Sequence, residues 1–125
     1  MAAAEITGNN FDKTIESGIV LLDWWATWCG PCRAFAPTFE RASEQHDDIV
    51  FGKIDTDAQP GLARKFGIRS IPTLMVFRDG ILIFEQAGAL PAPALEELIG
   101  KVRALDMDVV RKQIAEGEPQ DADAG

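Results

Sequence analysis

The feature that most constrains this chain is a run of apolar residues that ends shortly before two closely spaced cysteines. Residues 19–25 read IVLLDWW, and a near-continuous apolar run predicts a strand buried on both faces. Gly30 and Pro31 then predict the start of a helix, because proline is tolerated in a first turn whose amides have no internal partner. Residues 50–55 predict a second, parallel strand, so the three elements form a right-handed βαβ unit.

The rest of the chain predicts further strands and helices on either side of this unit. A short strand over residues 5–7 and a helix over 10–17 are expected before it, and four elements are expected after it, at residues 60–66, 73–78, 81–86 and 95–105. Asp79-Gly80 stands between the last two strands and is a strong hairpin signal. This order of elements predicts an α/β fold in which helices cover both faces of a central mixed sheet.

Length and charge limit the classes of function. A chain of 125 residues with 46% hydrophobic residues predicts a soluble globular protein. Its net charge of −8 argues against binding to nucleic acids or anionic membranes, which need clustered lysine and arginine. No apolar run approaches the roughly 18 residues of a membrane span. The N-terminus has no basic segment followed by an apolar one, so we expect a cytoplasmic protein; a secreted or membrane-tethered form would require a lost N-terminal segment.

The C-terminal residues predict an extension to the main domain. We expect one domain over residues 1–105 and an extension over 106–125, which carries six acidic and two basic residues. Val109, Val110 and Ile114 predict a short helix capped by an aspartate. The polar, acidic stretch that follows, residues 117–125, predicts disorder. We expect these three apolar residues to pack on the main domain, to extend its last helix or to dock a partner.

The two cysteines, Cys29 and Cys32, leave three alternatives open. Together with His46 they are too few for a structural zinc site, which usually takes four ligands, so we expect no metal. His46 lies in a polar stretch and is predicted to be exposed. A structural disulfide across so short a loop would add little stability. Two unpaired buried thiols are the second alternative, and a redox-active pair is the third.

The setting of the cysteines favours the redox alternative. Residues three apart on a helix turn face the same way, within reach of a disulfide, so the pair opens and closes with little backbone movement. Cys29 stands at the helix N-terminus, where free amides and the helix dipole lower the pKa of a thiol. Cys29 is therefore the predicted nucleophile, and the deeper Cys32 resolves the mixed disulfide. Gly30 and Pro31 offer no side chain that stabilises the thiolate, which favours a reductant.

Three segments of the chain resemble the thioredoxin family. They are DWWATWCGPC at residues 23–32, GIRSIPT at 67–73 and GAL at 88–90. The resemblance covers about residues 11–105 and implies the thioredoxin fold, no bound cofactor and a protein-disulfide reductase that a thioredoxin reductase recharges. It also implies clients of the ribonucleotide reductase, peroxiredoxin and methionine sulfoxide reductase types.

The resemblance also implies roles for residues around the cysteines. Asp23 would lie behind Cys32 and move its proton, and burial of such a carboxyl raises its pKa. Lys53 would stand beside Asp23 and stabilise the negative charge of its carboxylate. Ile71-Pro72 would be a cis peptide against the cysteines, where the Ile71 backbone pairs with an extended client segment. The client-binding patch predicted around Cys29 consists of Trp28, Gly30, Pro31, Ile71, Pro72, Gly88 and Ala89.

A binding protein is the second class of function that this sequence allows. Some proteins with this fold serve as accessory subunits valued for their surface, with incidental redox activity. Replacing both cysteines by serine separates the two, because a pure binding role would survive. We expect a monomer, since no large apolar stripe is evident beyond the client-binding patch.

Overall fold

The computed structural model describes residues 3–124, with side chains up to residue 117. Its elements occur in the order β1 (Ala3–Glu5), α1 (Phe11–Ile15), β2 (Ile19–Trp25), α2 (Gly30–Gln45), β3 (Val50–Asp55), α3 (Pro60–Lys65), β4 (Thr73–Arg78), β5 (Ile81–Ala87), α4 (Ala92–Ala104) and α5 (Met107–Ala124). The sheet has the order β1-β3-β2-β4-β5. Strands β1, β3 and β2 run parallel, and β4 and β5 are antiparallel to their neighbours. The predicted α/β fold with a mixed sheet is confirmed.

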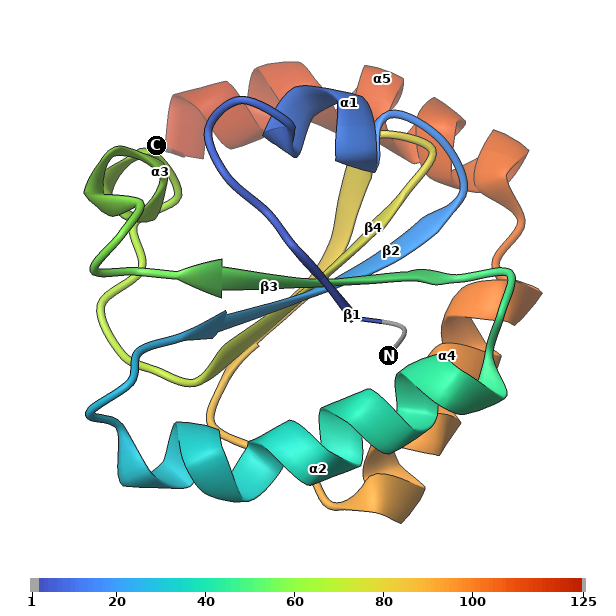
Figure 1. Cartoon of the computed structure of the whole chain (residues 1–125). Coiled ribbons are helices and arrows are strands. Elements are labelled where there is room, and N and C mark those ends of the chain that lie inside the picture. Colours follow the sequence, from blue (N-terminus) through green and yellow to red (C-terminus); the bar gives the residue numbers. More distant parts are fainter. Residues whose placement is uncertain (1–2, 125) are drawn as a thin grey trace.

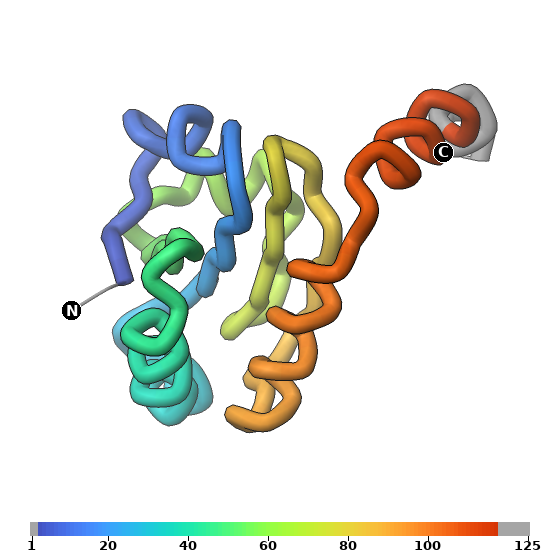
Figure 2. The backbone as a smooth tube through the Cα atoms, turned by 90° about the vertical axis from the view of Figure 1, so that its right-hand side faces the viewer, coloured from blue at the N-terminus to red at the C-terminus, as the bar shows by residue number. Residues whose placement is uncertain are grey.

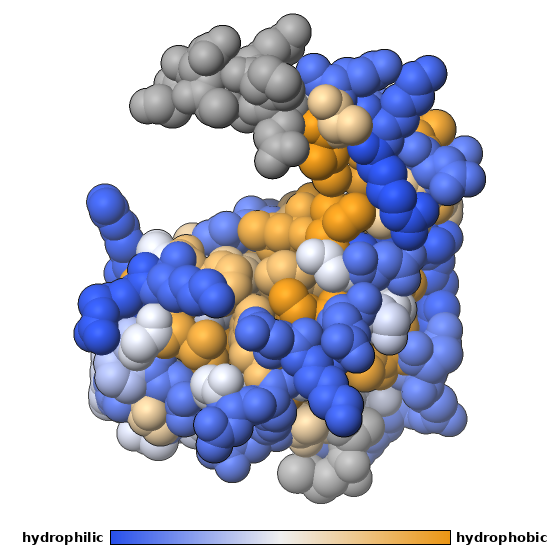
Figure 3. Space-filling view, turned by 90° about the horizontal axis from the view of Figure 1, so that it is seen from above, coloured by the Kyte–Doolittle hydropathy of each residue, from blue (hydrophilic) through white to orange (hydrophobic). Residues whose placement is uncertain are grey.

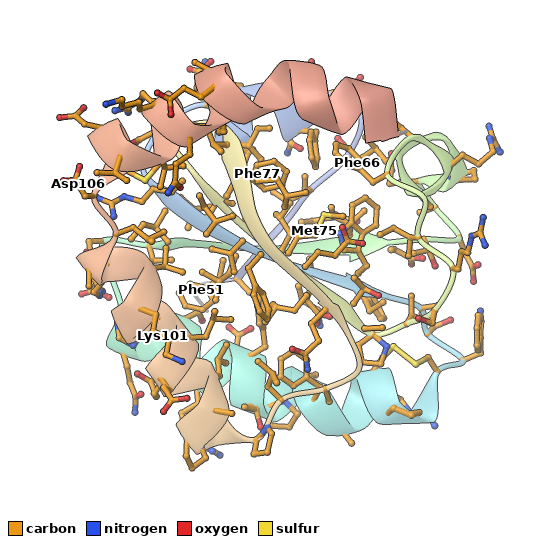
Figure 4. All side chains as sticks on the ribbon, turned by 180° about the vertical axis from the view of Figure 1, so that it is seen from behind. Phe51, Phe66, Met75, Phe77, Lys101 and Asp106 are labelled. Atoms are coloured by element: carbon orange, nitrogen blue, oxygen red, sulfur yellow. A yellow bond between two sulfur atoms is a disulfide. The ribbon has the colours of Figure 1, made fainter. Side chains whose placement is uncertain are left out.

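A large hydrophobic cluster lies on each face of the sheet, and a smaller cluster surrounds the two cysteines. Helices α2 and α4 cover one face, and α1 and α3 cover the other (Figure 1). Side chains alternate along β2, so Leu21 packs under α2 and α4, whereas Trp24 packs under α3. Figure 4 shows the same division, with Phe51 toward α2 and α4 and with Phe66 and Phe77 on the opposite face.

The local signals of the sequence account for the ends of several elements. Asp79 and Gly80 have φ angles of 53° and 83°, as a type I′ hairpin turn between β4 and β5 requires. Proline stands in the first turn of α2, α3 and α4. Helix α2 continues from Gly30 to Gln45 with Pro37 inside it.

Helix α5 differs from the expected short helix followed by a disordered tail, since it runs from Met107 to Ala124. Asp106 caps it through its Oδ1, which accepts bonds from the amides of Asp108 and Val109. Good helix formers such as Arg111, Lys112 and Gln113 follow the cap. The helix projects from the body beside β5 (Figure 2). Hydrophobic side chains lie in the hollow between them (Figure 3), where a groove of about 410 Å³ is lined by residues of β5 and α5.

The prediction that His46 is exposed is wrong. Its ring is mostly buried, with Nε2 lying 2.7 Å from Oε1 of Glu96 and Nδ1 lying 3.0 Å from Nη2 of Arg103. Both partners belong to α4, and Arg103 also pairs with Asp48. His46 thus joins the end of α2 to α4, a long-range contact that the polar sequence around it did not reveal.

Candidate active site

The two cysteines lie where β2 passes into α2. Cys29 is the N-cap of α2, and its Sγ accepts a bond of 3.1 Å from the amide of Cys32. The two residues form a disulfide with their Cα atoms 5.2 Å apart, and Figure 4 shows this bond at the start of α2. The predicted spacing, pairing and position at a helix N-terminus are all observed.

Both sulfurs are close to the surface but largely covered. Cys29 keeps 4% of its surface exposed and Cys32 keeps 2%, so the difference in depth expected between them is small. Ala26, Trp25 and Ile71 pack around the pair. A reacting disulfide must therefore approach Cys29 closely and in a narrow range of directions.

The helix N-terminus gives Cys29 the electrostatic setting of a nucleophile. The first amides of a helix have no partner within it and carry a partial positive charge. One of these amides, from Cys32, already points at the Cys29 sulfur. When the disulfide opens, the same amide stabilises a thiolate on Cys29.

A turn from another part of the chain faces the cysteines. The Ile71-Pro72 peptide bond is cis, and the carbonyl oxygen of Ile71 lies 3.7 Å from Sγ of Cys29. The carbonyl of Pro72 accepts a bond of 2.7 Å from the amide of Gly88. Gly88 has a φ of 99°, a conformation that favours glycine. These contacts bring residues of three separate sequence segments together around one sulfur.

The side chain of Trp28, the residue before Cys29, is exposed to solvent. It is 67% exposed, the most exposed of the large hydrophobic residues that the structure describes. Its Nε1 donates a bond of 2.9 Å to Oδ2 of Asp57. Asp57 follows β3, and its amide is held in turn by Asp55. Asp57 was not among the residues expected at the site; its one signal in the sequence is a carboxylate just beyond the end of β3, the strand that pairs with β2.

Asp23 is the one fully buried carboxyl of the described residues, and neither of its oxygens has a hydrogen-bond partner. Alternation along β2 puts it on the face covered by α2, between Leu21, which packs with that helix, and Trp25, which packs against the cysteines. Burial raises the pKa of Asp23 from 3.8 to about 7, and the charge of Lys53 opposes this rise. A carboxyl with this pKa exchanges its proton near neutral pH.

Lys53 lies on β3 opposite Asp23 in the register of the sheet. Its ammonium group sits 4.6 Å from the centre of the Trp25 ring, a cation–π contact. The charge of Lys53 lowers the pKa of Asp23 without a hydrogen bond to either carboxyl oxygen. Lys53 is therefore the neighbour of Asp23 across the β2–β3 pair.

The remaining residues of the predicted patch differ in exposure. Gly30, Pro31, Gly88 and Ala89 are exposed, whereas Pro72 is buried. Pro72 therefore offers a client little surface of its own. Thr73, which follows it, was not expected at the site either, although it ends the GIRSIPT segment; it is buried, and its Oγ1 donates to the carbonyl of Ser70.

This geometry defines a class of protein. A cysteine pair that forms a disulfide at the start of a helix, directly after a buried central strand, is the site of a thiol–disulfide oxidoreductase. The family model described as Thioredoxin matches residues 2–101. The chain belongs to the thioredoxin family, whose members exchange electrons with disulfide-containing client proteins and with a reductase.

Relatives named as thioredoxins support this assignment. The chain is 53% identical over 120 residues to a Streptomyces coelicolor protein named "Putative thioredoxin 2", covering 95% of this chain and 90% of that one. It is 44% identical over 104 residues to the thioredoxin of Staphylococcus haemolyticus, covering 81% of this chain and 98% of that one. The Streptomyces alignment is long enough to reach into α5, whereas the family model ends before it.

Solved structures show the same fold. A mutant thioredoxin from Halobacterium salinarum matches with a TM-score of 0.76 and 36% identity, over 83% of this chain and 93% of that one. A thioredoxin from Malassezia sympodialis matches with a TM-score of 0.73 and 33% identity, over 81% and 93% of the two chains. In the part of the chain that the structure describes, no helix is both long and apolar enough to cross a bilayer.

Proposed function

We propose that the chain reduces protein disulfides with Cys29 as the attacking sulfur and Cys32 as the resolving one. The Cys29 thiolate attacks one sulfur of the client disulfide, the client S–S bond breaks, and a mixed disulfide forms as the other client sulfur leaves. Cys32 then loses its proton and attacks Cys29, which frees the reduced client and closes the Cys29–Cys32 bond. The observation that carries this order of events is the position of Cys29 as N-cap of α2, with the Cys32 amide aimed at its sulfur.

Asp23 is the proposed acceptor of the Cys32 proton. Its pKa of about 7 suits a group that takes up and releases a proton at neutral pH. The two unpartnered oxygens support this role, since nothing else in the core uses them. Lys53 is proposed to keep the pKa of Asp23 from rising further, because its charge stabilises the ionised carboxyl.

The client is proposed to bind as an extended segment along Ile71. The Ile71 backbone beside Sγ of Cys29 supports this mode, in which backbone groups pair as between strands. Trp28, Gly30, Pro31, Pro72, Gly88 and Ala89 complete the proposed client-binding patch. A small patch held mainly through backbone bonds suits a carrier that serves many clients with modest affinity.

The proposed partners are a thioredoxin reductase and clients of the ribonucleotide reductase, peroxiredoxin and methionine sulfoxide reductase types, encountered in the cytoplasm by a monomer. Membership of the family and a Gly-Pro pair between the cysteines support this proposal. The net charge of −8 supports the absence of nucleic-acid or anionic-membrane partners. The alternative of an accessory subunit has no support from the relatives, which are named as thioredoxins.

We also propose that residues 1–105 form the thioredoxin domain and residues 106–125 an extension to it. The family model ends at residue 101, within α4, which supports a boundary at the end of that helix. Residue Leu105 lies between α4 and α5 and is not helical.

Single cysteine variants test the proposed order of attack. Cys32→Ser should accumulate a covalent complex with a disulfide-containing client such as insulin, visible on a non-reducing gel, because the mixed disulfide cannot be resolved. Cys29→Ser should form no such complex, and the double variant should lose dithiothreitol-driven insulin reduction. A complex trapped by Cys29→Ser instead would reverse the two roles, and full activity of the double variant would remove the redox function.

A further inference from the structure

We infer that the hydroxyl of Thr73 is a positioning group that holds the Ile71 backbone in place for the client. Thr73 is buried, and its Oγ1 donates a bond of 2.6 Å to the carbonyl of Ser70. The backbone of Thr73 belongs to β4 and pairs with Trp24 on one side and Ala87 on the other. The side chain, and not the strand, therefore closes the turn that runs from Ser70 to Thr73.

One of the two middle residues of this turn, Ile71, lies against the reacting sulfur. The carbonyl of Ile71 lies 3.7 Å from Sγ of Cys29, and the carbonyl of Pro72 is bonded to the amide of Gly88. The Pro72 bond fixes the end of the turn nearest β4. The Thr73 hydroxyl fixes the other end, where it reaches back over Pro72 and Ile71 to Ser70.

Packing holds that other end only at Ile71, which is partly buried against the core and the cysteines. Arg69 and Ser70 are both exposed, and Ile71 is only partly buried. Without the Thr73 hydroxyl, the segment before Pro72 gains freedom, and a client must order it on binding. Ordering a loose segment opposes association, so a preformed turn raises affinity without adding a contact.

This inference rests on the proposed function, because it assumes that clients pair with the Ile71 backbone. It adds that docking depends on a residue that does not itself touch the client. The cysteine chemistry is set separately, by the helix N-terminus and Asp23. Loss of the hydroxyl should therefore weaken client docking and leave the reactivity of Cys29 unchanged.

The chain provides a matched control for the hydroxyl. Ser43 is also buried, and its Oγ also donates a bond of 2.6 Å to the carbonyl three residues earlier, that of Glu40. Ser43 lies in the last third of α2, far along the helix from Cys29. Removing each hydroxyl costs one buried bond of the same length, but only Thr73 belongs to the turn beside the cysteines.

The test compares full-length wild type with Thr73→Val, Thr73→Ser and Ser43→Ala. Insulin reduction gives kcat and KM for a protein disulfide, and alkylation of the reduced protein by iodoacetamide across pH gives the reactivity of Cys29. We expect Thr73→Val to raise the KM for insulin roughly threefold to tenfold, the effect of about one hydrogen bond, with kcat and the alkylation profile unchanged. Thr73→Ser should restore the KM, and Ser43→Ala should leave it at the wild-type value.

Other outcomes would overturn the inference. A wild-type KM in Thr73→Val, or an equal rise in Ser43→Ala, would show that the turn does not need this hydroxyl. A change in the alkylation profile would show that Thr73 acts on the thiolate and not on docking. If neither Thr73→Val nor Thr73→Ala folds, the hydroxyl supports the whole fold and is not a positioning group. If wild type itself fails to reduce insulin, it is the proposed function that fails.

Discussion

The two ends of the central sheet treat their aspartates in opposite ways: the one beside the cysteines is buried and the one in the hairpin is exposed. At the end that carries the cysteines, Asp23 is fully buried and neither oxygen has a partner. At the other end, Asp79 in the β4–β5 hairpin has a partner for each oxygen. Its Oδ1 accepts a bond of 3.0 Å from the amide of Gly18, and its Oδ2 lies 3.3 Å from Nη2 of Arg111.

The same contrast extends to the neighbours of the two aspartates. Next to Asp79, the Arg78 guanidinium donates to the carbonyls of Val102 and Leu105 at the end of α4, where helix carbonyls lack partners within the helix. Next to Asp23, the indole nitrogen of Trp24 is buried without a partner. An unpartnered buried charge lowers stability, whereas a bonded one supports the fold. The comparison shows that the hairpin end of the sheet is built for stability, whereas the other end keeps a buried carboxyl without partners, which lowers stability.

The largest expected effect is on stability when Asp23 is replaced by alanine. A carboxyl with a pKa of about 7 when folded and 3.8 when unfolded keeps its proton on folding, so folding becomes less favourable as pH rises between these values. Asp23→Ala should therefore raise the free energy of unfolding by about 4 kcal/mol at pH 8. Near pH 4 the same substitution should raise it by less than about 1 kcal/mol. Urea denaturation at a series of pH values measures this difference.

The Asp23→Ala variant should also separate stability from activity. If Asp23 accepts the Cys32 proton, disulfide exchange slows at neutral pH while Cys29 stays reactive toward iodoacetamide. Stopped-flow tryptophan fluorescence with a protein disulfide measures the exchange rate. A pH–rate profile identical to that of wild type would remove Asp23 from the mechanism, and a stability gain independent of pH would contradict its raised pKa.

The next effect is the opposite one, at the other end of the sheet. Asp79→Ala removes the bond to Gly18 and places alanine at a φ of 53°, a conformation that disfavours it. The free energy of unfolding should fall by about 2 kcal/mol, with no change in the rate of insulin reduction.

Asp79→Asn is the matched control for this change. It keeps the Oδ1 acceptor and a residue that tolerates positive φ, and it loses only an ion pair that is partly exposed to solvent. Its loss of stability should stay below about 0.5 kcal/mol. If Asp79→Ala or Asp79→Asn lost insulin reduction, the hairpin end of the sheet would contribute to activity and not only to stability.

A smaller effect than that of Asp79→Ala is expected from ending the chain after Leu105. This truncation removes α5. Among the described residues of α5, Met107 is the hydrophobic one that is buried. Removing Met107 should lower the free energy of unfolding by about 1 kcal/mol. The rate of insulin reduction should not change, because α5 begins at the end of the sheet opposite the cysteines. Altered turnover with one client or with the reductase, and not with others, would instead give α5 a docking role.

Much of the fold could be predicted because its signals are local. The bounds of β2, β3 and β4 agree with those expected from apolar runs, and the Asp79-Gly80 hairpin follows from turn preferences. Predictions were weakest at the ends of the chain, where β1 begins two residues earlier than expected and α5 continues into the stretch that was expected to be disordered. Those elements have few core side chains to mark them, so the sequence pattern there is faint.

The sequence by itself determined the placement of two cysteines at the start of a helix after a buried strand, because hydrophobic pattern and helix-start residues act over a few neighbouring positions. Other features became visible only once the chain was folded. Both oxygens of Asp23 lack partners, and Asp57 accepts a bond from Trp28. The ring of His46 contacts Arg103 and Glu96, and the Thr73 hydroxyl closes the turn beside Cys29. Each of these depends on segments that meet across the sheet or on how completely water is excluded. The order of residues along the chain does not record either property.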